Sequence, residues 1–130
     1  MISSLDSLAL YGLLVVITLI LQAIGALQQL GIGYLLSSRD EHRSLEGMTA
    51  RLDRALNNSI TAMALFAPAV LLIHTQNITT PYVDTVALVF LIARLVYLPC
   101  YVFDIQGLRS GAWGVGFFAT LALYTVALTY

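Results

Sequence analysis

The sequence contains no lysine and few charged side chains of any kind. Six arginines and seven acidic residues make up 10% of its 130 residues, whereas an ordinary globular domain carries about 25%. A soluble domain of this size has a large surface for its volume and needs polar groups to cover it. So few charges argue against a soluble domain and favour a protein whose surface faces lipid.

Other classes of protein are disfavoured by what is missing. The net charge of −1 lacks the basic excess that is typical of nucleic-acid binders, so no nucleic-acid partner is expected. The single cysteine, Cys100, cannot form an internal disulfide, and its apolar neighbours favour a packing role over a nucleophile. The two histidines, His42 and His74, fall in connections that are expected on opposite sides of a membrane, so no metal site is expected.

Long apolar runs are abundant. Hydrophobic residues make up 59% of the chain, and residues 8–27 form a nearly continuous run of about the 20 residues that cross a bilayer core. The glycines of the same segment, Gly25, Gly31 and Gly33, are interpreted as helix-packing positions. Three further spans are expected at residues 48–73, 81–103 and 111–130. The sequence therefore predicts an all-α integral membrane protein, a single four-transmembrane-helix bundle over residues 1–130.

The arginines also predict the orientation of the bundle. Four of them flank the first connection and Arg109 flanks the third, whereas the termini and the second connection have none. Because arginine is enriched in cytoplasmic loops, both termini are expected on the non-cytoplasmic side. Tyrosine and tryptophan are enriched at the membrane interfaces. We therefore assign aromatic residues to the inner interface (Tyr34 and Trp113) or to the outer one (Tyr11, Tyr82, Tyr124 and Tyr130).

Polar residues on the second expected helix form one stripe. Ionisable side chains at the centre of a membrane helix cost roughly 2.5–3.5 kcal/mol on insertion scales and usually face the bundle interior or a cavity. Arg51, Arg54, Asn58 and Thr61 recur at spacings of 3, 4 and 3 residues, which places them on one helix face. Binding of a polar ligand is one interpretation, and hydrogen bonding between helices is the other.

A second stripe lies on the third expected helix, where Arg94, Tyr97, Tyr101 and Asp104 repeat the same spacing. Arg94 requires an anionic or carbonyl partner, from a ligand or from the protein. A structural ion pair with Asp104 or Asp53 is the alternative, although Asp104 is about ten residues, or ~15 Å, farther along the helix.

Both stripes, together with Arg109 and Ser110, are expected at one depth near the cytoplasmic side. At this depth they would form a cleft in the inner leaflet, lined by arginines, phenols, an amide and hydroxyls. Such a cleft suits an anionic, flexible, polar ligand that reacts with a lipophilic partner.

Five segments carry a resemblance to a known family. The sequence is similar to the bacterial branch of MAPEG proteins, the membrane-associated proteins in eicosanoid and glutathione metabolism. The similarity runs in collinear order through roughly residues 30 to 120. Its segments are Ser-Arg-Asp at 38–40, Arg-Leu-Asp-Arg-Ala-Leu-Asn-Asn at 51–58, Phe-Ala-Pro-Ala-Val-Leu at 66–71, Ala-Arg-Leu-Val-Tyr-Leu-Pro-Cys-Tyr at 93–101, and Gly-Leu-Arg-Ser at 107–110 followed by Trp113.

The resemblance implies a homotrimer in the bacterial inner (plasma) membrane, with glutathione held between neighbouring subunits near the cytoplasmic face. Arg109 matches the arginine that assists the glutathione thiolate, and Tyr101 is assigned with it as catalytic. The residues assigned to glutathione binding are Arg51, Arg54, Asn58, Thr61, Arg94, Tyr97 and Ser110.

One position departs from the family pattern. The family pattern is Arg-Ala-x-x-Asn-x-x-Glu, and this chain has Thr61 at the position of the glutamate. Threonine cannot supply the negative charge of that glutamate. The resemblance therefore implies two functions. One is a glutathione-dependent transferase or peroxidase that acts on lipophilic electrophiles or hydroperoxides. The other is a non-catalytic, lipid-binding or accessory membrane subunit.

Overall fold

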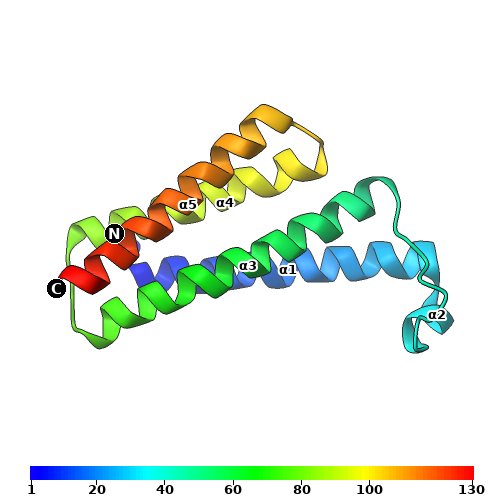
Figure 1. The fold of residues 1–130 in the computed structure, drawn as a ribbon, viewed down its shortest axis with the longest axis horizontal. Helices are drawn as coiled ribbons and strands as arrows, with labels where there is room; N and C mark the ends of the chain where they lie inside the picture. The colour runs from blue at the N-terminus through cyan, green and yellow to red at the C-terminus, as the bar shows by residue number, and fades with distance from the viewer.

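The structure, a computed structural model, describes all 130 residues. It consists of α-helices joined by turns and loops (Figure 1). Four of the five helices are long and apolar enough to cross a membrane. The prediction of an all-α chain with four helices able to span a membrane is therefore confirmed. The helices are α1 (Ser4–Leu30), α2 (Ile32–Leu36), α3 (Gly47–Thr75), α4 (Pro81–Val102) and α5 (Gln106–Thr129).

Capping residues fix where two of the long helices begin. The Ser3 side chain accepts a hydrogen bond from the Asp6 backbone, and the Asp6 carboxylate accepts one from the Ser3 backbone at 3.0 Å. This reciprocal pair satisfies two of the free N–H groups at the start of α1. At α4, the Thr80 side chain accepts from Val83 and Pro81 occupies the first turn, where its missing N–H is not needed.

Two boundaries differ from the prediction. Helix α5 begins at Gln106 rather than Gly111, so Arg109 and Ser110 lie within its first two turns. The prediction took the first uncharged residue as the start, but a helix can continue past the apolar core, where a charge is tolerated. The short helix α2 was not predicted, because residues 7–38 contain no ionisable residue that would mark a break.

Gly31 produces the break between α1 and α2. Its backbone has φ +81, a conformation that glycine adopts without the steric penalty of a Cβ. A Cβ added at Gly31 or Gly33 would meet no atom within 4 Å, so these two glycines do not pack against another helix of the same protomer. Gly25 does pack closely, because a Cβ there would lie 2.6 Å from Thr49 Oγ1.

The long helices run up and down, so both termini lie at the end opposite α2 (Figure 1). Helices α1 and α3 pack along each other, and α4 and α5 form a second pair. Aromatic rings join the two pairs: Phe66 of α3 stacks on Phe90 of α4 at 3.8 Å between centroids, and Tyr11 of α1 meets Phe90 edge-on at 4.9 Å. The predicted place of Tyr11 at the outer interface is wrong, because this side chain is fully buried.

Candidate functional site

Arg94 of α4 lies at the centre of the bundle and is 2% exposed. One of its terminal nitrogens donates to the Asn58 side-chain oxygen at 2.9 Å and to Ser59 Oγ at 3.1 Å. Its Nε is buried and has no hydrogen-bond partner. Both acceptors are neutral, so the positive charge of Arg94 has only dipoles for compensation.

Two tyrosine rings lie near the guanidinium. Its central carbon is 4.0 Å from the centroid of the Tyr97 ring and 6.0 Å from that of Tyr11. Cation–π contacts of this kind are worth about 0.5–2 kcal/mol, the larger values applying away from water. The Tyr11 hydroxyl donates to the Ser59 backbone oxygen at 2.8 Å. This bond links α1 to the part of α3 whose side chains accept hydrogen bonds from Arg94.

No carboxylate is paired with Arg94. The only ion pair in the chain joins Arg43 and Glu41. Asp53 accepts a hydrogen bond from Gln22 at 3.0 Å, and Asp104 lies in the turn after α4. The ion pair with Asp104 or Asp53, which the sequence left open as the alternative for Arg94, is therefore absent from the protomer.

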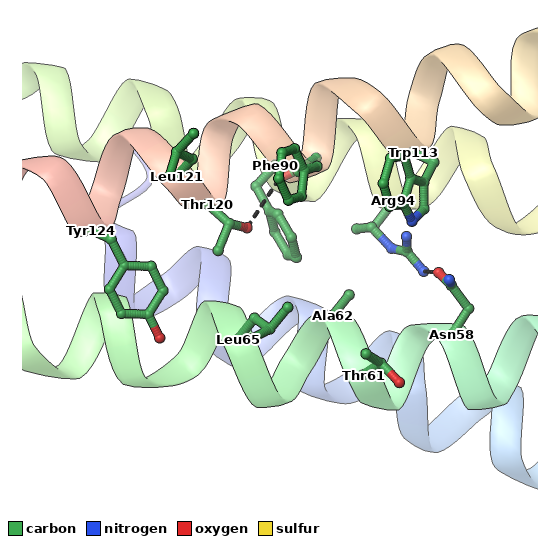
Figure 2. A pocket seen from close by; sticks show the side chains of 12 residues that line it. Asn58, Thr61, Ala62, Leu65, Phe90, Arg94, Trp113, Thr120, Leu121 and Tyr124 are labelled. Atoms are coloured by element: carbon green, nitrogen blue, oxygen red, sulfur yellow. Dashed lines mark hydrogen bonds between the residues drawn. The ribbon is translucent and has the colours of Figure 1, made fainter.

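A cavity of about 300 Å³ opens between α3, α4 and α5 beside this arginine (Figure 2). Asn58, Thr61, Arg94 and Trp113 lie at one end, and Leu65, Leu121 and Tyr124 lie toward the other. The Thr61 hydroxyl donates back to the Asn57 carbonyl at 3.0 Å. The cavity thus has a cationic end and an apolar end, which suits a ligand with an anionic group and a lipophilic part.

A smaller cavity of about 240 Å³ lies beside the first, toward the α4–α5 turn. Trp113 lines both cavities, and the Arg109 guanidinium lies 4.8 Å from the centroid of the Tyr101 ring. The fold therefore brings together seven of the nine residues that the sequence assigned to the site. They are Asn58, Thr61 and Arg94 in the larger cavity, Tyr101, Arg109 and Ser110 in the smaller one, and Tyr97, which lines the smaller cavity and contacts Arg94.

The two remaining residues lie elsewhere in the protomer. Arg51 donates to the Val102 carbonyl at the end of α4, at 2.8 Å. Arg54 is exposed and lines a separate cavity near α2. The single stripe expected on α3 is therefore divided among three environments.

Three residues around Arg94 were not among the predicted site residues: Tyr11, Ser59 and Phe90. Phe90 lines the larger cavity, and the other two form the hydrogen bonds described above. Ser59 could have been predicted, because it is a polar residue directly after Asn58 in the sequence. Tyr11 could not have been predicted, because a tyrosine in an apolar run has the same sequence pattern whether it faces the membrane interface or the core.

A comparison with known protein families identifies one match. The model of the MAPEG family matches residues 7–129, nearly the whole chain. No match is found among curated proteins or among solved structures. With its four apolar helices long enough to span a membrane, this chain belongs to the MAPEG family.

Proposed function

We propose that this protein is a glutathione-dependent transferase or peroxidase of the membrane, acting on lipophilic electrophiles or hydroperoxides. The observation that carries the proposal is Arg94, a buried cation without an anionic partner at one end of an open cavity. Isolated buried charges are costly unless they are paired. An anionic ligand would supply the missing charge, and glutathione carries two carboxylates.

Hydrogen-bonding groups around Arg94 fit a peptide ligand. The side-chain amide of Asn58 offers donors, and the hydroxyl of Thr61 offers a neutral hydrogen bond. Charge-assisted hydrogen bonds contribute about 1.5–3 kcal/mol, and neutral ones about 0.5–1.5 kcal/mol. With Thr61 in place of a glutamate, we expect weaker glutathione binding than in a site with the carboxylate.

The smaller cavity would receive the thiol. Arg109 is the one cationic residue in its wall, and it forms no ion pair. The guanidinium of Arg109 contacts the ring of Tyr101, which carries a hydroxyl. A neighbouring cation favours the thiolate, which is the reactive nucleophile. The thiol proton leaves to solvent, and the sulfur electron pair then forms a bond to the electrophilic carbon as the leaving group departs with its electrons. Arg109 and Tyr101 would stabilise the thiolate before this attack.

The apolar end of the larger cavity would hold the lipophilic substrate. Its lining includes Leu65, Phe117 and Leu121, and the cavity is walled by three membrane helices. A substrate dissolved in the bilayer could reach this end without crossing water. This arrangement would place the polar peptide and the apolar substrate on adjacent surfaces.

Assembly as a homotrimer in the bacterial inner membrane, with both termini outside the cytoplasm, completes the proposal. Arg51 and Arg54 lie outside the Arg94 cavity within one protomer, so they would reach glutathione only at a subunit boundary. Native mass spectrometry in mild detergent should show trimers. A purely monomeric spectrum would contradict this part of the proposal.

Thiolate formation is the direct test of the proposed chemistry. Glutathione added to the detergent-solubilised protein should produce the ultraviolet difference absorbance of a thiolate. Arg109→Ala should reduce this signal at saturating glutathione, whereas Arg109→Lys should keep most of it. If glutathione binds without forming a thiolate, the enzyme proposal fails. If it does not bind at all, a non-catalytic lipid-binding or accessory role takes its place.

A further inference from the structure

A third cavity, of about 390 Å³, lies between α1, α2, α3 and the loop that joins the last two. Its wall combines apolar and cationic side chains. Ala26, Leu30 and Leu35 supply carbon surface, and Arg39, Arg43 and Arg54 supply three positive charges. It is separate from the site described above, because the two cavities share no lining residue.

Two acidic side chains lie beside these arginines, Asp53 in the cavity wall and Glu41 outside it. Asp53 is the only acidic residue in the wall, and one of its oxygens accepts from Gln22. Arg54 makes no hydrogen bond or ion pair, and Arg43 is held by Glu41, at 2.7 Å, in an exposed pair. Exposed ion pairs contribute little to stability, so Arg43 is available to another anion.

The backbone around the cavity is held in place by the same residues. Arg39 donates two hydrogen bonds to the Leu35 carbonyl at the end of α2, at 3.0 and 3.3 Å. The Tyr34 hydroxyl accepts from the Arg43 backbone at 2.8 Å, and its ring lies 4.7 Å from the Arg43 guanidinium. Two of the three cations are thus positioned by contacts with α2, although both side chains remain exposed.

The position of α2 places this cavity at the lipid headgroups. Helix α1 has 27 residues, about 40 Å at 1.5 Å per residue, which exceeds an apolar core of ~30 Å. The far end of α1 therefore reaches the headgroup region, and α2 continues from it (Figure 1). Ile32 and Leu36 of α2 are 62% and 80% exposed, as in short apolar helices that lie in the interface.

We propose that this cavity binds the phosphate of an acidic phospholipid in the leaflet at the α2 end of the bundle. Arg39, Arg43 and Arg54 would contact the phosphate oxygens, for which arginine forks are suited. The lipid chains would lie on Leu30 and Leu35, beside the apolar side chains of α2. Such a lipid would hold the α1–α3 loop against the membrane. Arg54 is also assigned to glutathione at a subunit boundary, so the tests of the lipid site use Arg43 and Glu41, which the glutathione proposal does not include.

Native mass spectrometry of the detergent-solubilised protein would test the proposal, with short-chain phosphatidylglycerol and phosphatidylcholine of identical acyl chains as probes. Both lipids carry the phosphate, but phosphatidylcholine adds a quaternary ammonium that the arginines repel, so we expect phosphatidylglycerol to bind at least tenfold more tightly. Arg43→Gln should weaken its binding about tenfold, the loss of one charge-assisted hydrogen bond. Glu41→Gln should strengthen it, because that change releases Arg43 from its ion pair. A gain of binding cannot result from misfolding.

Arg109→Gln is the matched control, since it removes one arginine from the same end of the bundle but outside the cavity. It should change phosphatidylglycerol binding by less than about twofold. Equal binding of both lipids, or no effect of Arg43→Gln and Glu41→Gln, would overturn the proposal. Displacement of phosphatidylglycerol by millimolar inorganic phosphate would also overturn it, because the site would then recognise a soluble phosphate.

Discussion

Asn58 of α3 and Arg94 of α4 are joined by a hydrogen bond of 2.9 Å, and both face the same cavity. The amide oxygen is neutral, so this bond orients the guanidinium without cancelling its charge. The same nitrogen of Arg94 also donates to Ser59, whose backbone oxygen accepts from Tyr11. Three helices therefore hold one unpaired cation at a fixed place inside an apolar bundle.

Replacing this cation with an apolar side chain of similar length should cost little stability. Arg94→Met leaves two acceptors without a donor, which is unfavourable, but it also removes an unpaired buried charge, which is favourable. We expect the free energy of unfolding in detergent to change by less than about 2 kcal/mol. A loss of about 3–5 kcal/mol, as when one partner of a buried ion pair is removed, would mean that Arg94 has an anionic partner in the folded protein.

Thr61→Glu should tighten glutathione binding about tenfold, because a charge-assisted hydrogen bond replaces a neutral one. Thr61 lies in the wall of the Arg94 cavity, where its hydroxyl bonds only to the Asn57 carbonyl. Calorimetric titration would measure the change in affinity.

Thr85→Glu is the matched control for this substitution. Thr85 is also exposed and donates to the carbonyl four residues earlier, but it is not in the wall of the Arg94 cavity. Its replacement should leave the affinity unchanged. Equal gains from both glutamates would show that the added charge acts without a specific site at residue 61.

Gly25→Ala should destabilise the contact between α1 and α3. The new Cβ would lie 2.6 Å from Thr49 Oγ1 and 2.7 Å from Thr49 Cγ2. Overpacking of this kind costs about 1–3 kcal/mol, partly offset by a gain of up to ~1 kcal/mol in helix propensity. Thermal unfolding should show a lower midpoint, restored by adding Thr49→Ala. Gly114→Ala, which meets no atom within 4 Å, should show no loss.

The orientation is tested by reporters at two positions. A reporter after Tyr130 should behave as periplasmic, and one inserted near Glu46 as cytoplasmic, because the arginines cluster around the first and third connections. The reverse pattern would contradict the orientation. Reporters on the same side would contradict the four crossings themselves, since three spans separate the two positions.

The sequence was sufficient to predict the four spans because each is a long run with few charges. Pro81 marked the start of α4 correctly, and α3 includes the charged turns from Met48 onward, as expected. Helix α2 could not be predicted, because nothing in the composition distinguishes Gly31 from Gly25. Gly31 has a positive φ and ends α1, whereas Gly25 lies within α1 and packs against Thr49 of α3. That difference depends on tertiary contacts.

The site was predictable to the extent that helical spacing determines it. The spacing correctly placed Asn58 and Thr61 on one face of α3, and both line the cavity beside Arg94. It could not show that Arg51 turns to the end of α4 and that Arg54 lines a separate cavity near α2. These differences arise because one face of α3 meets different neighbours along its length, which spacing within one helix does not encode.

The most direct test of glutathione binding at Arg94 is calorimetric titration of glutathione into the native protein and into Arg94→Met. We expect saturable binding to the native protein and at least a tenfold loss of affinity in Arg94→Met, with Arg94→Lys between them, because the ammonium keeps the charge but loses the fork. Binding that is unchanged in Arg94→Met, or no binding of millimolar glutathione to either the native protein or Thr61→Glu, would contradict the proposed site.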